Sequence, residues 1–325
     1  MLSLGFWEPV LILAGLNAII AIGVYITLMS GQASLAHAAF AGIGAYSAAV
    51  LTTNFHVPFP LAILAGMSVG LVGGALLSLV TMRMSLLVVA LTTLGFGETM
   101  VVIAFNIEYL GGAQSFSGIP LYTSIGLVYA VLALVLFVAW RFDHSRLGLA
   151  ARAVRDSSVT AAAMGINVPL VRILTFALGG GIAALGGGLS AHYTLVINPG
   201  DMTFFESFRY KLFVLTGGSY TFLGPLAGAL ALTLLPEALR VALALSDVLS
   251  QSLRFMIYGI IVVLVVIWRP QGVITRVPTG VRARFPWPGR PAARVSPAAK
   301  VAALAAESRA DRADASLGSP GADRP

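Results

Sequence analysis

The sequence predicts an all-α fold, a polytopic bundle of about nine transmembrane helices. Of its 325 residues, 58% are hydrophobic and only 10% are charged, whereas soluble domains carry about 25% charged residues. The stretch between Glu8 and Arg83 contains no Asp, Glu, Lys or Arg at all. Its apolar runs suit helices of about 20 residues rather than the shorter alternating strands of a barrel, and a helix satisfies its own backbone hydrogen bonds in lipid.

The predicted spans follow one another with short connections, apart from one long polar segment. The first begins at Pro9 without a basic region or a cleavage site, which indicates a retained span rather than a signal peptide. The seventh and eighth are short and flank Gly217–Pro225, so they can also form a re-entrant pair, and the count ranges from about eight to ten. The spans are predicted at residues 10–29, 34–53, 60–82, 85–106, 121–141, 170–193, 208–222, 223–243 and 250–268.

Glycine is frequent in these spans, with 35 in the whole chain. Small residues allow transmembrane helices to approach each other closely, so this composition predicts a tightly packed bundle or helices that break near a pathway. Around the seventh and eighth spans, the residues predicted to serve helix packing or a re-entrant turn are Gly217, Gly218, Gly224 and Pro225.

The long polar segment occupies residues 143–169. Structureless loops of this length are usually functional or disordered, but two Ala-rich stretches, Leu149–Val154 and Val159–Met164, predict short helices. The segment is therefore predicted to form a compact helical knob that docks on a soluble partner. The predicted cap and boundary residues are Ser157 or Ser158 before the second helix, Gly165 after it and Pro169 at the start of the next span.

Basic residues cluster at three places that this topology brings to one side: at Arg83, around the knob and after Arg269. Cytoplasmic loops of membrane proteins are enriched in Lys and Arg, so the knob and the C-terminal tail are predicted to be cytoplasmic. The formal net charge of +7 lies mostly in the tail, which favours topology over nucleic-acid binding. Residues 1–275 are predicted to form the membrane domain, and residues 276–325 a disordered basic tail.

The inventory of catalytic residues is thin. The chain has no cysteine, and none of its four histidines has metal-ligand spacing with another histidine. It has no G-x-S-x-G, H-E-x-x-H or G-x-x-x-x-G-K-[ST] motif. The sequence therefore predicts a protein that is not an enzyme and needs no metal or cofactor. If it transports with the help of ATP, another chain must supply the ATPase.

Polar residues inside apolar spans are the candidates for a translocation pathway, because ionisable groups within a membrane are usually functional. Glu98 lies in LTTLGFGETM and His37 in SGQASLAHAAF. The alternatives are a Glu98 side chain that only hydrogen-bonds another helix and a His37 side chain that only packs in the core. The predicted pathway residues are Gln32, Ser34, His37, Thr92, Thr93 and Glu98.

Further charges lie around the seventh and eighth spans. Arg209 and Lys211 follow the loop that contains Asp201 and Glu206. They are expected to reach the interface or pair with these carboxylates, or else to contact a partner outside the membrane. Glu237 and Arg240, at the end of the eighth span, are expected to form a surface ion pair or else to make a similar contact outside the membrane.

Five stretches in one order resemble LivM-type permeases, the permease subunits of branched-chain amino-acid ABC importers. The knob sequence SRLGLAARAVRDSSVTAAAMGINV is similar to the cytoplasmic coupling loop of such permeases. The other stretches are SGQASLAHAAFAGIGAY, LTTLGFGE, GGAQSFSGIP, LTGGSYTFLGPLAGAL and, running on from it, LPEALR and RPQG. Together they extend over residues 30–272, nearly the whole membrane region.

The resemblance implies an importer that works by alternating access in the bacterial inner membrane. Its other parts would be a second, LivH-like permease, two ATP-binding subunits of the LivG and LivF type and a periplasmic substrate-binding protein. The chain departs from the family pattern at Gln114, Ala162 and Lys211. The departures at Gln114 and Lys211 affect which substrate the resemblance implies. The residues that the resemblance places at the ATPase interface are Arg146, Gly148, Arg152, Arg155, Ala162 and Gly165.

Two other functions remain open from the sequence. A permease of the same family for urea or short amides, or for aromatic acids, would share every motif, because the binding protein largely sets selectivity. A proton-coupled secondary transporter working alone would need carboxylates near the midplane, and Glu98 is the clear candidate.

Overall fold

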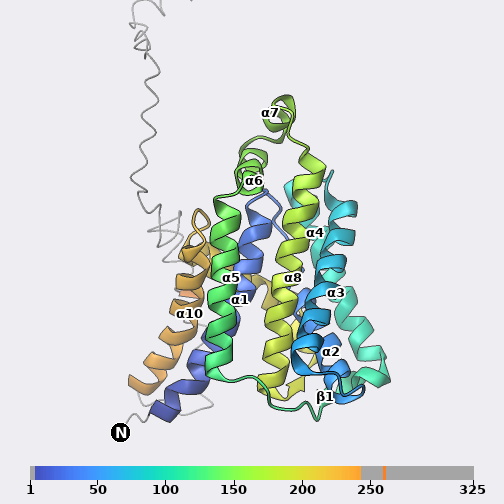
Figure 1. The fold of residues 1–325 in the computed structure, drawn as a ribbon, viewed down its shortest axis with the longest axis vertical. Coiled ribbons are helices and arrows are strands. Elements are labelled where there is room, and N and C mark those ends of the chain that lie inside the picture. The colour runs from blue at the N-terminus through green and yellow to red at the C-terminus, as the bar shows by residue number, and fades with distance from the viewer. Residues whose placement is uncertain (1–3, 243–258, 261–325) are drawn as a thin grey trace, which may run out of the picture. The chain divides into compact units, whose positions relative to one another are not determined.

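The computed structural model describes residues 4–242 and 259–260. Within this part the chain forms ten α-helices and one pair of short strands (Figure 1). The predicted ninth span lies almost entirely outside the described residues, and the predicted tail does so entirely. The helices are α1 (Leu4–Leu28), α2 (His37–Thr53), α3 (Phe59–Thr81), α4 (Leu86–Asn106), α5 (Ile125–Asp143), α6 (Arg146–Asp156), α7 (Ser158–Ala163), α8 (Val168–Thr194), α9 (Phe204–Gly217) and α10 (Leu223–Ala242).

Helix α8 lies at the centre of the bundle and packs against α1, α2 and α3. Helix α1 in turn contacts α5, α9 and α10. Successive long helices run in opposite directions, so the knob, residues 143–169, lies at one end, called here the knob end (Figure 1). The turn that contains Arg83 lies at the same end, because the Arg172 guanidinium of α8 donates to the carbonyl oxygen of Met82, 2.5 Å away.

Close backbone contacts between α2 and α8 explain the glycine content. A Cβ atom at Gly187 of α8 would overlap the carbonyl oxygen of Ala41 in α2. A Cβ atom at Gly44 of α2 would overlap the carbonyl oxygen of Ala184 in α8. Only glycine permits these two helices to pack at this distance.

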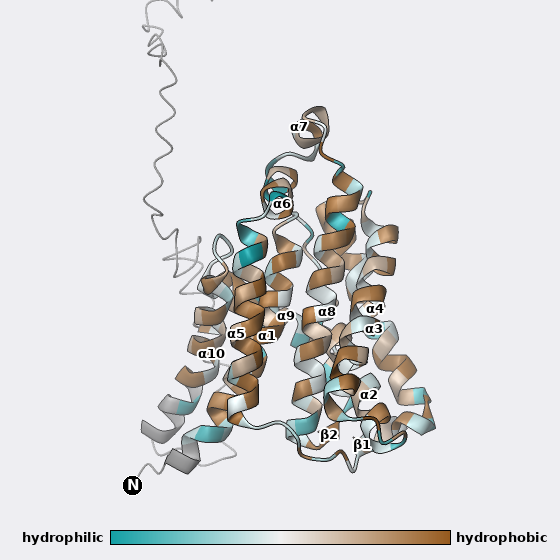
Figure 2. Ribbon diagram, in the orientation of Figure 1, coloured by the Kyte–Doolittle hydropathy of each residue, from teal (hydrophilic) through white to brown (hydrophobic). Residues whose placement is uncertain are grey.

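Five of the described helices are long and apolar enough to cross a membrane: α3, α4, α5, α8 and residues 7–28 of α1. Figure 2 shows that hydrophobic residues dominate the long helices, whereas polar ones gather near α6. Helices α3, α4 and α5 bury less than a third of their apolar windows, and exposed apolar side chains such as Leu64, Leu87 and Leu134 suit contact with lipid. The chain is thus an α-helical, multi-pass membrane bundle.

Two predicted spans differ from the structure because their helices are short. Helix α2 has 17 residues and α9 has 14. At 1.5 Å per residue they reach about 25 Å and about 21 Å, less than the hydrocarbon thickness of about 30 Å. The first part of the predicted span 34–53 is not helical, and the predicted span 208–222 extends beyond the end of α9. The count of nine spans stays a prediction.

The knob contains the two predicted helices, α6 and α7. Both begin with a serine that accepts a hydrogen bond from a backbone N–H: Ser145 from Gly148 at 3.1 Å, and Ser157 from Thr160 at 3.2 Å. Gly165 ends the second helix in a left-handed conformation, at φ +81°. Pro169 lies in the first turn of α8, as expected from the sequence.

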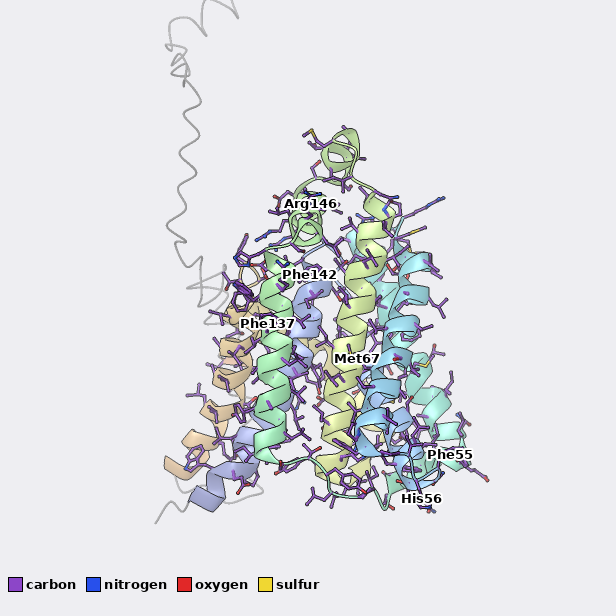
Figure 3. The ribbon with its side chains drawn as sticks, in the orientation of Figure 1. Phe55, His56, Met67, Phe137, Phe142 and Arg146 are labelled. Carbon is purple, nitrogen blue, oxygen red and sulfur yellow. The ribbon has the colours of Figure 1, made fainter. Side chains whose placement is uncertain are left out.

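At the opposite end, a small ladder joins the segments that lead into α5 and α9. Strand β1 (Phe116–Ser117) pairs with β2 (Val196–Ile197) in antiparallel register, Phe116 opposite Ile197. Three short 3-10 helices flank it: η1 (Glu108–Leu110), η2 (Gly112–Gln114) and η3 (Pro199–Met202). Figure 3 shows Phe55 and His56 at this end and Arg146 at the knob end.

Candidate functional site

The connection between α1 and α2 is a buried, non-helical segment, residues 29–36. Its polar backbone groups bond to side chains of other helices. Leu35 N donates to Thr93 Oγ1 of α4 at 2.9 Å, and Ala38 N, in the first turn of α2, donates to Ser207 Oγ of α9 at 3.1 Å. At membrane depth, irregular backbone is tolerated only where protein buries it or where it lines a cavity. This segment is therefore packed inside the bundle and not turned to lipid.

Buried polar side chains hold this segment against α3 and α8. Gln32 Nε2 lies 3.5 Å from Ser78 Oγ of α3, and Gln32 Oε1 accepts from Ser30 Oγ at 3.3 Å. Ser30 Oγ is also 2.7 Å from Thr175 Oγ1 of α8. The predicted pathway residue Ser34 accepts a hydrogen bond from Ala36 N at 3.2 Å. Gln32 and Ser34 therefore lie in a bonded polar layer that closes the bundle here.

His37 is 1% exposed and begins α2. Its Nε2 lies 3.1 Å from Thr27 Oγ1 of α1, and its ring is 6.3 Å, centroid to centroid, from those of both Phe40 and Phe176. These contacts are typical of a core histidine, although the buried Nδ1 atom has no hydrogen-bond partner among the described residues. The structure thus places His37 among packing residues rather than on the wall of a described cavity.

Glu98 contacts the short helix α9. Its Oε1 accepts a hydrogen bond from Phe204 N, the first residue of α9, at 2.8 Å. A carboxylate at this place satisfies a backbone N–H that has no partner within the helix, and it complements the helix dipole. Thr92 makes a different contact, 3.7 Å from Met84 Sδ. Glu98 thus positions α9, and the structure does not bring it together with Gln32, Ser34 or His37.

The starts of α2 and α9 meet inside the bundle. Ser207, in the first turn of α9, bonds the first turn of α2, and Lys211, one turn further on, lies 3.5 Å from the carbonyl oxygen of Ala33. Short helices that begin within a bundle are typical of transporter binding sites. This junction separates the bonded polar layer described above from the part of the bundle furthest from the knob.

Beyond this junction lies a cavity of about 360 Å³ between α1, α8, α9 and α10, called here the polar cavity. Its acidic and basic lining residues are Asp201, Glu206, Arg209 and Glu237. Arg209 Nη2 lies 2.5 Å from Glu206 Oε2. Glu237 is buried, with only 8% of its surface exposed. The predicted pairing of Arg209 with a carboxylate of this loop is confirmed by its contact with Glu206. Lys211 lies outside the hollow, near Ala33.

Asn17 and Thr233 complete the polar wall. Asn17 Nδ2 of α1 donates to Thr233 Oγ1 of α10 at 3.2 Å, and both residues line the polar cavity. Sequence reasoning missed them because each is a single neutral polar residue in a long apolar run. The one feature of the sequence that could have indicated these residues is an asparagine, Asn17, within a predicted membrane span.

A second, smaller cavity of about 60 Å³ adjoins the first and shares Asp201 and Tyr210 with it. Its other walls include Gly42 of α2, Gly187 of α8 and Met202 of η3. A Cβ atom at Gly42 would overlap the side chain of Met202. The hollow is therefore bounded by the contact of α2 with η3 and by α8.

At the knob, Arg152 and Arg155 bond within the chain. Arg152 Nη1 lies 3.2 Å from Asp143 Oδ1, and Arg155 Nη1 donates to the carbonyl oxygen of Ser219 at 3.2 Å while its guanidinium covers the ring of Tyr220. The knob also exposes apolar side chains, Val159 at 80% and Met164 at 79%, beside exposed polar ones such as Asp156. Of the other predicted interface residues, Gly148 is buried, whereas Arg146, Ala162 and Gly165 are exposed.

The predicted glycine cluster forms the hairpin between α9 and α10. A Cβ atom at Gly217 would overlap the carbonyl oxygen of Gly224, and one at Gly224 would overlap that of Gly218. Gly218 itself has a φ of +113°. Pro225 lies in the first turn of α10, where its missing N–H costs nothing. The two helices thus form a tight antiparallel pair.

Comparison with known proteins identifies the family. Residues 7–266 match the family described as branched-chain amino acid transport system / permease component. The chain belongs to this permease family. Because its relatives are permease proteins of transport systems, the chain is a membrane subunit of a transporter and not an enzyme.

Two of the similar relatives are LivM permeases of high-affinity branched-chain amino acid transport systems. The protein of Salmonella typhimurium is 26% identical over 299 residues and that of Escherichia coli K12 25% identical over 298, each match covering 81% of this chain and 67% of the relative. The LivH permease of Salmonella typhimurium is 31% identical over 181 residues, 53% of this chain and 54% of the relative. No solved structure matches the chain.

The permease therefore resembles two differently named subunits of the same kind of transport system. Such a system contains a second permease besides this one.

Proposed function

We propose that the chain is the permease subunit of an ATP-driven importer that moves branched-chain amino acids across the bacterial inner membrane. The relatives support the substrate, since their names state branched-chain amino acid transport. The single observation that supports coupling is the knob, a pair of capped helices with an exposed apolar tip at the end away from the polar cavity.

The proposed assembly holds a LivH-like permease, two ATP-binding subunits of the LivG and LivF type and a periplasmic binding protein. No G-x-x-x-x-G-K-[ST] motif occurs in the sequence, so ATP hydrolysis is assigned to the other subunits. Arg83 and the knob arginines share one end of the bundle, which supports a cytoplasmic knob. The polar cavity then faces the periplasm, where the binding protein delivers substrate.

In this mechanism, α8 and α1 couple movements of the knob to the polar cavity. Helix α8 leaves the knob and ends at the wall of the polar cavity, and α1 ends next to Gly31, whose backbone lies against Arg155 of α6. Closure of the ATP-binding subunits would move the knob and switch the bundle between two states. The substrate is pumped only if it binds these states with different affinity.

Replacing both Val159 and Met164 by aspartate is expected to release the ATP-binding subunits. The tip would exchange an apolar contact for two charges that must be desolvated on docking. Co-purification of the ATP-binding subunits with the detergent-extracted permease measures this, and a loss of most of the bound subunit is expected.

The matched control is Phe55→Asp, which changes a similarly exposed apolar residue at the opposite end. It is expected to keep the ATP-binding subunits bound. If the knob variant keeps them as well as this control does, the knob is not the docking element. The arginine pair is a poorer choice for this test, because Arg152 and Arg155 hold the knob onto the bundle.

A further inference from the structure

A cavity of about 400 Å³ lies between α2, α4, η1 and η3, apart from the polar cavity, and is called here the apolar cavity. Its volume falls within the range of about 300–1,000 Å³ typical of ligand sites. None of the described residues that line it is charged, and its polar groups are the hydroxyls of Ser47, Tyr46 and Tyr109. Water needs several polar partners to occupy a cavity, and the charges of an amino acid need partners as well. The guest that suits these walls is therefore apolar.

The apolar cavity opens on a surface that suits contact with lipid. Ile103 of α4 and Tyr109 of η1 line the cavity and are 42% and 58% exposed. The neighbouring side chains Val102 and Phe105 of α4 are exposed too, and α4 is long and apolar enough to cross a membrane. Hydrocarbon is the solvent at such a surface, so the bilayer itself supplies an apolar guest.

The floor of the apolar cavity lies well below this surface. Met202 of η3 and Ala104 of α4 line it, and each residue is only 3% exposed. A lipid that merely covers the surface does not reach them, so a guest that fills the cavity must be thin and flexible. An acyl chain has this shape, and methionine side chains adapt to such a guest. Because the chain leaves one apolar medium for another, the gain comes from dispersion contacts that an empty cavity lacks.

The rim of the apolar cavity lies at the end of the bundle opposite the knob. Asn54 Nδ2 donates to the Tyr109 hydroxyl oxygen at 2.7 Å, which joins the chain just after α2 to the chain just after α4. Figure 3 shows Phe55, the residue after Asn54, at this end. Tyrosine is enriched where a membrane meets water. The Tyr109 O–H is thus placed to donate to an ester carbonyl of a lipid whose chain enters the cavity.

We propose that the apolar cavity binds one acyl chain of a membrane phospholipid. The chain enters between Ile103 and Tyr109 and ends against Met202. Met202 also lines the hollow of about 60 Å³ described above, and its side chain occupies the space that a Cβ atom at Gly42 would need. The bound chain therefore supports η3, the segment that leads into α9. This site does not depend on which solute the transporter moves.

The test is photolabelling of the full-length chain in liposomes of phosphatidylethanolamine and phosphatidylglycerol. The phosphatidylethanolamine carries a diazirine near the end of one acyl chain, and mass spectrometry locates the labelled residues. Leu64 of α3, which is 56% exposed, reports lipid at the surface of the bundle. Label is expected on Met202 and Ala104 as well as on Leu64. Label on Leu64 without label on either buried residue would overturn the proposal.

Variants that fill the cavity show whether the label at Met202 enters through it. Ala104→Leu fills the cavity from α4 and Ser47→Leu fills it from α2. Each is expected to lose most of the label at Met202 and to keep the label at Leu64. The matched control is Ala90→Leu, the same change in α4 outside the cavity, which is expected to be labelled as the wild type is.

Monodisperse elution of the solubilised variant establishes that it has folded. Because the two fillings act from different helices, each tests the proposal if the other fails to fold. If a folded variant with a filled cavity keeps the label at Met202, the acyl chain does not occupy the cavity and the proposal is wrong.

A helix of the second permease is the rival occupant of this surface. Photolabelling of the chain co-purified with that permease distinguishes the two. The label at Met202 is expected to remain in the assembled complex. Its loss on assembly, with Leu64 still labelled, would show that the second permease covers the cavity and that a lipid does not.

Discussion

Gly187→Ala is expected to cause the largest loss of stability of any single-residue change considered. The new Cβ would overlap the carbonyl oxygen of Ala41, a backbone atom that cannot rotate away. Helices α2 and α8 would have to separate, although the second contact, Gly44 against Ala184, holds them together nearby. Overpacking of this kind costs about 1–3 kcal/mol and sometimes more. The unfolding midpoint and the monodisperse yield of the detergent-solubilised chain measure the effect.

Gly95→Ala is the matched control for this change. Gly95 also lies in the middle of a membrane-length helix, α4, but a Cβ there would meet no atom within 4 Å. The unfolding midpoint of the Gly95→Ala variant is expected to stay unchanged or rise slightly, because alanine favours a helix more than glycine does. Equal losses in the two variants would show that helix composition, and not the α2–α8 contact, limits stability.

Asp143→Ala is expected to uncouple ATP hydrolysis from transport. Asp143 is 8% exposed at the end of α5, and its carboxylate joins α6 to the bundle through Arg152 at 3.2 Å and accepts from the Tyr25 hydroxyl of α1 at 3.3 Å. Hydrogen bonds to charged groups contribute about 1.5–3 kcal/mol each, and less here because Arg152 is partly exposed. The knob would lose its fixed orientation, and the ratio of substrate moved to ATP hydrolysed is expected to fall several-fold.

Asp156→Ala provides the comparison. Asp156 is an exposed carboxylate at the far end of α6, so its loss changes the charge of the knob without freeing α6. Its transport ratio is expected to equal that of the wild type. If Asp143→Ala also leaves this ratio unchanged, rigid attachment of α6 to α5 is not required for coupling.

Local signals in the sequence predicted the long helices and the knob. Apolar length predicted α3, α4, α5 and α8 within a few residues, and Ser157, Gly165 and Pro169 marked the boundaries at the knob. These features depend on neighbours in the sequence, because a helix bonds within itself and a cap acts on the next turn. The multi-pass helical fold and the permease family were confirmed for the same reason: both follow from patterns along the chain.

Contacts between distant segments could not be predicted in this way. Glu98 caps α9, 106 residues away, and Arg155 bonds Ser219, 64 residues away. The segment at residues 29–36 bonds through Leu35 N to Thr93, and Ala38 N, just after it in α2, bonds to Ser207, which is 169 residues away. The polar cavity likewise needs single residues from four helices, none of which forms a motif by itself.

The most direct test of the account is uptake of labelled leucine into proteoliposomes that contain the complete importer and its binding protein, in wild type and Glu98→Gln. Uptake is expected to require ATP, to be insensitive to collapse of a proton gradient and to persist in Glu98→Gln, whose amide oxygen still accepts from Phe204 N. Leucine uptake by this chain alone, driven by a proton gradient and lost in Glu98→Gln, would contradict the account and identify a proton-coupled transporter.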